Sequence, residues 1–262
     1  MRLAESALPK ISRKTLLYKS GVKYADYALN HVEGCSHACA YPCYAMMMKR
    51  RFSAVKSFDD WIRPKIVGNT LELLDKELPR LKTKMERVFL CFSTDPFMHE
   101  QPEIHELTLA ILRRLHKENI NAVVITKGVY PSELADTSRY GTGNEYGSTI
   151  VTLAEEFRQR FEPGAAPILA RINSLRTLHE AGLKTWVSME PYPTPNIIKQ
   201  DIRDMMCAVS FVDKIVFGRW NYSRQSSAFA GAKVFYESMA NHVIKFGKEF
   251  SVGVHIKEGT AG

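Results

Sequence analysis

The chain has 262 residues, 45% of them hydrophobic, and carries a formal net charge of +8 with a pI near 9.2. This length and composition allow a sizeable hydrophobic core, in one large α/β domain or in two small ones. No run approaches the roughly 20 apolar residues of a membrane span, and the first residues contain no signal-peptide core, so the sequence predicts a cytoplasmic protein without a membrane partner. The basic excess favours a polyanion such as nucleic acid as a partner, although many soluble proteins are equally basic.

Apolar, β-branched runs alternate with amphipathic segments along most of the chain, which is typical of parallel βα units. Strands are predicted, in chain order, at residues 23–30, 87–93, 121–127, 148–153, 183–189, 213–218 and 249–256. Helices with apolar residues at spacings of three and four are predicted at residues 102–119, 166–182 and 235–247. Thr108 is the one polar residue in the apolar stripe of the first of these helices. The irregular stretch 136–148 is interpreted as a surface connection.

Six βα units followed by one extra strand predict an α/β fold, a partial (β/α)6 barrel of parallel strands. A doubly wound open sheet is the alternative, because the pattern does not fix the strand order. We expect residues 1–22 to form an N-terminal extension and residues 23–262 to form the barrel domain.

Three of the five cysteines, Cys35, Cys39 and Cys43, stand four residues apart after the first predicted strand. Disulfides are the weakest interpretation, because five is an odd number and three of the thiols crowd into nine residues. Soft thiolates select zinc or iron–sulfur centres, and three close thiolates suit three irons of a cubane cluster. Zinc with His37 as a fourth ligand, or three buried thiols, are the alternatives.

The stretch "GCSHACAYPCYA", followed by "STDPF", "ITKG", "RFEPGAAP", "RINSLRTLHEAGL" and "FGRWNYS", resembles the radical S-adenosylmethionine (SAM) enzymes. Within them it is similar to the spore photoproduct lyase group, and the resemblance covers roughly residues 25 to 225. The usual spacing in that family is C-x-x-x-C-x-x-C. Pro42 adds a residue here, which gives C-x-x-x-C-x-x-x-C.

The resemblance implies that Cys35, Cys39 and Cys43 bind a [4Fe-4S] cluster whose unique iron takes the amino and carboxylate groups of SAM. An electron from an external donor, such as a flavodoxin or ferredoxin, would cleave SAM to methionine and a 5′-deoxyadenosyl radical, which abstracts hydrogen from the substrate. The protein supplies positioning, electrostatics and exclusion of water.

The resemblance also points to SAM-binding residues in the loops that follow the strands. They are Ser93, Thr94 and Asp95 for the amino group, Lys127 for the carboxylate, Thr149 and Thr152 for the ribose or carboxylate, and Glu190 for a ribose hydroxyl. Ordinary structural roles, such as a helix cap, a solvated lysine or a β-forming threonine, are the alternatives.

Cys91 lies where spore photoproduct lyase carries a cysteine that returns a hydrogen atom to the product radical; a buried core thiol is the alternative. Tyr44, near the cofactor, and Tyr222, in a catalytic role, are candidates to relay hydrogen or stack on a base. Arg219 and Trp220 with Tyr222 would hold an unstacked base, unless they only pack together. We expect Cys207 and Met46–Met48 to be core-filling residues.

The sequence therefore predicts a radical SAM enzyme of lyase type, acting on a nucleic-acid base lesion. A radical SAM enzyme acting on a peptide or small metabolite, and a non-catalytic metal-stabilised nucleic-acid-binding protein, are the alternatives. The oligomeric state is left open.

Overall fold

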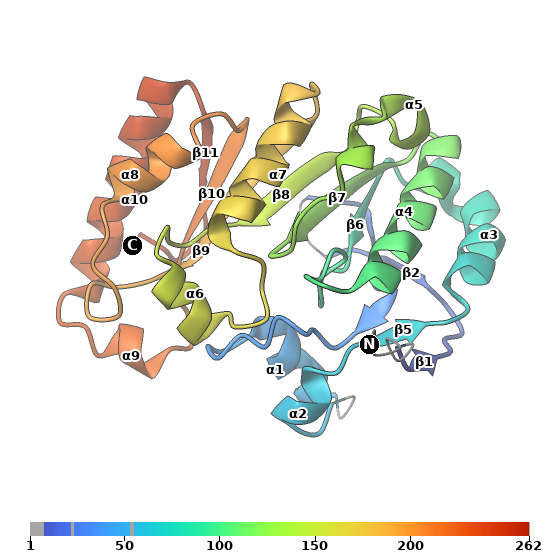
Figure 1. The fold of residues 1–262 in the computed structure, drawn as a ribbon, viewed down its shortest axis with the longest axis horizontal. Helices are drawn as coiled ribbons and strands as arrows, with labels where there is room; N and C mark the ends of the chain where they lie inside the picture. Colours follow the sequence, from blue (N-terminus) through green and yellow to red (C-terminus); the bar gives the residue numbers. More distant parts are fainter. Residues whose placement is uncertain (1–7, 22–23, 53–54, 262) are drawn as a thin grey trace, which may run out of the picture.

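The computed structural model describes residues 8–21, 24–52 and 55–261. Its main element is an eight-stranded sheet in the order β11-β10-β9-β8-β7-β6-β3-β2 (Figure 1). All neighbouring strands are parallel except β2 and β3, which are antiparallel. The strands are β2 (Leu17–Lys19), β3 (Tyr27–Leu29), β6 (Arg87–Leu90), β7 (Asn121–Thr126), β8 (Glu145–Thr149), β9 (Lys184–Tyr192), β10 (Lys214–Arg219) and β11 (Gly253–Ile256).

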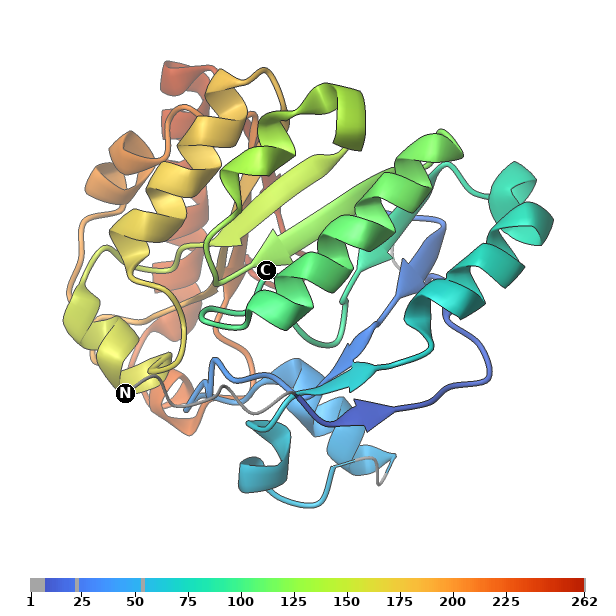
Figure 2. The ribbon, with the colours of Figure 1, turned by 45° about the vertical axis from the view of Figure 1, so that its right-hand side comes forward.

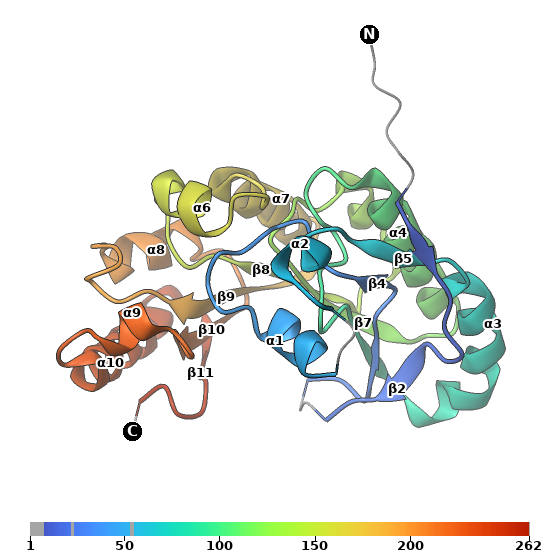
Figure 3. The ribbon, with the colours of Figure 1, turned by 90° about the horizontal axis from the view of Figure 1, so that it is seen from below.

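A second, three-stranded sheet has the order β1-β5-β4, with β1 (Lys10–Ile11) parallel and β4 (Val32–Glu33) antiparallel to β5 (Lys65–Val67). In the view from below it lies near the short helices α1 and α2 (Figure 3). Residues 8–21 thus contribute one strand to each sheet.

Helices flank the main sheet, with α4 and α7 both in front of it and β7 and β8 visible between them (Figures 1 and 2). Contacts join α4 to β7, α7 to β8 and β9, and α10 to β10. The helices are α1 (Tyr44–Arg51), α2 (Phe58–Trp61), α3 (Thr70–Leu81), α4 (Pro102–Lys117), α5 (Thr137–Tyr140), α6 (Glu155–Phe161), α7 (Ile168–Glu180), α8 (Ile202–Ala208), α9 (Arg224–Ser227) and α10 (Ala232–Phe250), with 3-10 turns η1 (Lys82–Lys84) and η2 (Ser132–Ala135).

Alternation along the strands divides the sheet into two faces. One face, with Val88, Leu90, Val124 and Val187, joins the helices in the main hydrophobic core. The other carries Phe89, Val123 and Ile125 and packs with Trp186, away from the helices. This second face is the inner face, and it bears the cavity described below.

The strand order follows the chain order from β3 to β11, so every crossover moves in the same direction. A doubly wound sheet reverses direction at a switch point, and this sheet has none among the described strands. The parallel α/β prediction is therefore confirmed. The sheet ends at β11 and β2, which are not paired with each other, so it is open rather than a closed barrel.

The fourth strand was predicted at residues 148–153, but β8 spans Glu145–Thr149. Ile150 and Val151 are buried in the following loop, so their apolar character resembled a strand. The true strand contains Gly147, where a Cβ would lie 2.3 Å from the Trp186 ring. The stretch 136–148 is thus not wholly a connection, because it contains α5 and the start of β8.

Other boundaries also differ from the prediction: the second predicted strand, 87–93, ends at Leu90 in β6, and the fifth, 183–189, extends to Tyr192 in β9. The first predicted strand, 23–30, is shorter as β3, and Lys23 lies outside the described residues. The last strand begins at Gly253 rather than 249, because α10 continues to Phe250. None of the described helices is long and apolar enough to cross a membrane.

Candidate active site

The three cysteines lie in the loop that joins β4 to α1. Cys43 is the N-cap residue of α1, and the backbone N–H of Cys35 donates to the carbonyl of Trp61 at 2.8 Å. All three thiols are half-buried and free. The loop packs closely on Gly164, where a Cβ would stand 2.1 Å from the carbonyl oxygen of Ser36.

The loop gives the cysteines a chemistry that suits a cationic centre. Burial raises the pKa of Cys35 well above its usual value, and the negative charges of Asp95, Cys39 and Cys43 add to this effect. Burial also raises the pKa of Cys39 to about 11, while Lys127 opposes the rise. The negative charges of neighbouring cysteines thus oppose the ionisation of Cys35 and Cys39, and a bound cationic centre would relieve this.

Three soft donors from one loop fit an iron–sulfur cluster, since the cluster's irons would supply the positive charge that buried thiolates need. Among the described residues, no three Cys, His, Asp or Glu side chains already converge as a ligand set. The fit therefore rests on the type of donors and their location.

His37 lies inside the same loop, but both ring nitrogens are engaged. The backbone N–H of His99 donates to Nε2 at 3.1 Å, so Nδ1 carries the proton of the neutral ring and faces Asp95 Oδ2 at 3.4 Å. Burial lowers the pKa of His37 to about 4, so the ring is neutral. No lone pair is left for a metal, which weakens the zinc alternative.

Asp95 fixes the turn after β6 and joins it to the cysteine loop. Its Oδ1 accepts from the N–H of Phe97 at 2.9 Å and from the Thr126 hydroxyl at 2.6 Å. Its Oδ2 accepts from the N–H of Lys127 at 2.9 Å and faces His37. The carboxylate is buried and serves as an acceptor for β7, the β6 turn and the cysteine loop together.

The side chain of Lys127 does not point to solvent. Its Nζ is 3.7 Å from the Sγ of Cys39, 3.3 Å from the Oε1 of Glu162, and hydrogen-bonded to the Tyr41 hydroxyl. Burial would lower the pKa of Lys127, but Cys39 and Glu162 outweigh it and raise the pKa above its usual value. The strand-end lysine is therefore charged and faces the cysteine loop.

Glu162 and Arg171 complete this buried network. The Nη1 of Arg171 donates to Oε2 of Glu162 at 2.8 Å, and Tyr41 donates to Oε1 at 2.7 Å. Burial would raise the pKa of Glu162, but Lys127 and Arg171 outweigh it and lower the pKa to about 2. Sequence reasoning did not single out either residue, although Glu162 lies in the quoted stretch "RFEPG".

A cavity of about 190 Å³ opens on the inner face of the sheet, between an aromatic wall and charged ends. The lining residues are Tyr24, Phe89, Cys91, Phe92, Thr94, Val123, Ile125, Glu145, Trp186, Ser188, Glu190, Lys214, Val216 and Lys257. Glu190 and Lys257 form one ion pair at this cavity, and Glu145 and Lys214 form another at 3.5 Å. Predicted residues from β6 and β9 thus meet at one cavity.

Cys91 lies at this cavity with an unusual backbone and a defined partner. Its φ is +55°, in the left-handed region, and its Sγ lies 3.4 Å from Nδ1 of His31. Nε2 of His31 lies 2.8 Å from the Thr108 hydroxyl, which itself donates to the carbonyls of Pro96 and Ile104. Thr108 must therefore accept from Nε2–H, so Nδ1 is bare and accepts the thiol proton of Cys91.

The structure brings the remaining SAM candidates to the carboxyl ends of β6, β8 and β9. The N–H of Ser93 donates to Asn30, the Thr94 hydroxyl to the carbonyl of Gly34, and Thr149 is buried with its carbonyl accepting from Arg171. Thr152 is also buried, and its hydroxyl accepts from the N–H of Ala154 at 3.1 Å. Among these residues, Thr94 contacts Gly34, the residue before Cys35.

The tyrosine candidates lie elsewhere. Tyr44 is half-exposed on α1, and Tyr222 is 69% exposed in a groove that Tyr41 and Pro42 also line. Neither belongs to the cavity that Cys91 lines.

Trp220 is buried against Tyr41, Phe157 and Phe161. The packing interpretation therefore holds for Trp220, and it offers no open face to a base.

The expectation that Cys207 and Met46–Met48 fill the core is wrong. Cys207 is exposed on α8. Helix α1 contains no buried residue, and Met47 is 41% exposed, because the helix lies at the edge of the fold instead of packing inside it (Figure 1).

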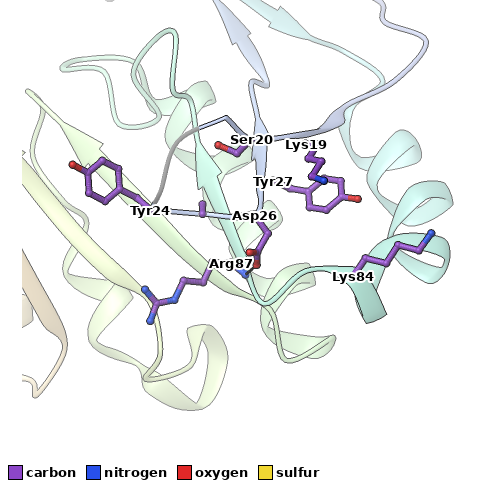
Figure 4. A pocket seen from close by; sticks show the side chains of 8 residues that line it. Lys19, Ser20, Tyr24, Asp26, Tyr27, Lys84 and Arg87 are labelled. Carbon is purple, nitrogen blue, oxygen red and sulfur yellow. Dashed lines mark hydrogen bonds between the residues drawn. The ribbon is translucent and has the colours of Figure 1, made fainter.

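The opposite end of the sheet carries an open groove of about 510 Å³ at the starts of β3 and β6, lined by Lys19, Lys84 and Arg87 among others (Figure 4). Asp26 there accepts from the backbone N–H groups of Glu86 and Arg87 at 2.8 and 3.1 Å. This carboxylate holds the two strand starts together, a structural role.

The fold and the cysteine loop together are those of a cofactor-dependent α/β enzyme. The family model of the radical SAM superfamily matches residues 29–206, so the chain belongs to the radical SAM superfamily. The cysteine motif C-x-x-x-C-x-x-x-C is compatible with this assignment. Membership implies a [4Fe-4S] cluster and SAM as cofactors.

Two relatives match this chain in sequence. The uncharacterized protein ORF301 of Acidianus two-tailed virus is 28% identical over 205 residues, which cover 75% of this chain and 67% of the relative. The uncharacterized protein MJ0683 of Methanocaldococcus jannaschii is 25% identical over 182 residues, 70% of this chain and 66% of the relative. The chain thus matches about two thirds of the length of each.

Solved structures of spore photoproduct lyase share the fold. The lyase complexed with dinucleoside spore photoproduct has a TM-score of 0.68 at 14% identity, over 95% of this chain and 81% of the lyase. A variant of the lyase with bound AdoMet and dinucleoside spore photoproduct has a TM-score of 0.67 at 12% identity, over 94% of this chain and 80% of the variant. At such low identity, the likeness shows the fold and not the substrate.

Proposed function

We propose that this protein cleaves SAM reductively, with a [4Fe-4S] cluster held by Cys35, Cys39 and Cys43. The observation that carries the proposal is the set of three half-buried thiols in one loop of a radical SAM chain. When bound, the cluster and SAM supply a 5′-deoxyadenosyl radical that abstracts hydrogen from the substrate. A small external carrier such as a flavodoxin or ferredoxin supplies the electron.

The chain's own residues position SAM and keep water out. The open sheet acts as a partial (β/α)6 barrel, and its inner cavity receives the reacting groups. Ser93 and Thr94 lie near the amino group of SAM, in a turn that Asp95 fixes through its hydrogen bonds to Phe97 and Lys127. Burial around this turn favours a dry site in which electrostatic interactions are strong.

Further residues complete the SAM site in this proposal. Glu190, at the cavity, binds a ribose hydroxyl, and Thr149 borders the ribose or carboxylate. Lys127 supplies positive charge near the carboxylate, and Tyr44 and Tyr222, both outside the cavity, contribute to cofactor binding and to catalysis respectively.

The substrate in this proposal is a nucleic-acid base lesion. The aromatic lining of the cavity, with Phe89, Phe92 and Trp186, suits a planar base, and the net charge of +8 suits a phosphate backbone. The spore photoproduct lyases of similar fold bind a dinucleoside lesion. Cys91 returns a hydrogen atom to the product radical, because its thiol lies at the cavity and its S–H bond is weak.

Anaerobic reconstitution tests the cofactor part of the proposal. A brown protein that forms 5′-deoxyadenosine from SAM with dithionite supports it, and Cys35→Ala should lose both the colour and the product. Cys207→Ala is the matched control, because Cys207 is exposed on α8, and it should retain both. A colourless protein that holds zinc contradicts the proposal.

The substrate part is tested by measuring 5′-deoxyadenosine with and without ultraviolet-damaged DNA. Damaged DNA should increase the yield and lose its lesions. An increase with peptides or small metabolites, and none with DNA, would favour the other class of substrate.

The role of Cys91 has its own test. Cys91→Ala should leave SAM cleavage within about twofold of wild type but change the distribution of products formed from the lesion, because the radical would be quenched by other donors. Cys91→Ser, which keeps the size but has a stronger O–H bond, should behave like Cys91→Ala. Loss of the cluster in both variants would show that Cys91 is structural instead.

A further inference from the structure

The geometry points to Lys127, held by Glu162 and Arg171, as the residue that sets the reduction potential of the cluster. This inference rests on the proposed cluster at Cys35, Cys39 and Cys43. It assigns a role to a buried ion network that SAM binding alone does not explain.

Lys127 leaves the carboxyl end of β7, and its backbone N–H is fixed by Asp95 at 2.9 Å. From there its side chain runs toward the cysteine loop, and Nζ lies 3.7 Å from the Sγ of Cys39. This is within the distance of an N–H···S hydrogen bond to a thiolate. Hydrogen bonds to cluster sulfurs and nearby positive charge both stabilise the reduced cluster, which is the more negative form.

The ammonium cannot easily leave this position. Nζ is bound by Glu162 Oε1 at 3.3 Å and by the Tyr41 hydroxyl, and it lies 4.8 Å from the centre of the Tyr41 ring. Only 16% of the Lys127 side chain is exposed. The charge is therefore presented to Cys39 by its surroundings rather than by a flexible surface side chain.

Glu162 in turn is held in place by an ion pair with Arg171. The side chains of Glu162 and Arg171 are 3% and 1% exposed, and they form a 2.8 Å ion pair. Arg171 is anchored by the backbone carbonyls of Ala166 and Thr149 at 2.8 and 3.1 Å. Buried pairs of this kind are costly, so their use beside the cysteine loop suggests a purpose other than stability.

The charges around the loop are arranged with opposite signs. Lys127 faces Cys39, whereas the negative charge of Asp95 acts on Cys35. Glu162 lies behind Lys127, one contact further from the sulfur, so its negative charge acts on the cluster over a longer distance. Removing Lys127 or Glu162 should then change the potential in opposite directions.

The test is an EPR-monitored redox titration of the reconstituted cluster without SAM. Lys127→Met should move the midpoint potential to a more negative value, and Lys127→Arg, which keeps the charge, should stay near wild type. Glu162→Gln should move it to a more positive value. Lys82→Met is the matched control, because Lys82 pairs with Glu118 at the surface, and it should have no effect.

Shifts of the same sign in Lys127→Met and Glu162→Gln, or an unchanged potential in Lys127→Met, would overturn the inference. If Lys127→Met loses the cluster, Lys127→Gln replaces it in the titration. If both neutral variants lose the cluster while Lys127→Arg keeps it, the positive charge is needed for cluster assembly, and the inference also fails. If Glu162→Gln does not fold, the comparison of Lys127→Met with Lys127→Arg decides. Failure of the wild-type chain to form any [4Fe-4S] cluster would instead refute the proposed function.

Discussion

The buried ring of His31 makes the free energy of unfolding depend on pH, and a single substitution at His31 measures this dependence. His31 is 0% exposed and lies between Cys91 and Thr108. Burial, with a smaller contribution from Arg13, lowers the pKa of His31 from 6.5 to about 3. In the folded chain the ring therefore stays neutral at any mildly acidic pH.

The unfolded chain binds a proton at this histidine as the pH falls through 6.5, and the folded chain does so only near pH 3. The contribution of the neutral His31 ring to the free energy of unfolding is therefore complete above pH 6.5 and is lost progressively as the pH falls toward 3. At pH 5 the pH lies about 1.5 units below the unfolded-state pKa of His31, which lowers the free energy of unfolding by about 2 kcal/mol at about 1.36 kcal/mol per unit. The Cys91 thiol beside the ring stays protonated over this range, because burial raises its pKa.

The substitution is His31→Gln, whose amide offers one donor to Thr108 and one acceptor to Cys91 without titrating. Urea unfolding of the full chain, followed by tryptophan fluorescence at pH 7 and pH 5, gives the free energy of unfolding of both proteins. The stability difference between wild type and variant should shift by about 2 kcal/mol in favour of the variant at pH 5. Other histidines, such as His37, are common to both proteins and cancel.

His242→Gln provides the control, because His242 is exposed on α10. The difference in free energy of unfolding between wild type and this variant should be the same at pH 7 and pH 5. The reasoning is refuted if wild type and His31→Gln lose stability equally between pH 7 and pH 5. That result would mean that the ring is hydrated or already charged in the folded chain.

Two glycine substitutions test the packing of the site. Gly164→Ala places a Cβ 2.1 Å from the carbonyl of Ser36 and should displace the cysteine loop, so iron incorporation should fall strongly, whereas Gly21→Ala, with nothing within 4 Å, should incorporate iron normally. Gly147→Ala places a Cβ 2.3 Å from Trp186 and should cost about 1–3 kcal/mol in thermal unfolding while changing tryptophan fluorescence. Normal iron content in the first variant, or unchanged fluorescence in the second, would show that these contacts relax freely.

Local patterns in the sequence were sufficient for most strands of the main sheet, for three of the helices and for singling out the cysteine loop. Apolar runs located the parallel strands from β3 to β11, and helical spacing located α4, α7 and α10, since burial on one face imposes these periods on any chain. The one misplaced strand shows the limit of this argument. Ile150 and Val151 are apolar because they are buried in a loop, and no local pattern separates that cause from a strand.

The sequence did not predict which side chains contact each other in the folded chain. Thr108 looked like a polar exception in a helical stripe, yet it sets the tautomer of His31 and thereby the direction of the Cys91 thiol. Lys127 was predicted at a strand end, but only the fold shows that it turns toward Cys39.

The sequence by itself determined the parallel α/β class, the triple of thiols and the loops that carry the candidate residues, because these depend on residue type and on spacing along the chain. Only the tertiary structure decided the strand order, the open sheet and the union of Lys127, Glu162 and Arg171 beside the cysteine loop. The physical reason is that the interactions involved join residues up to 121 positions apart, as between Tyr41 and Glu162. Such contacts depend on how the elements pack and leave no local periodicity.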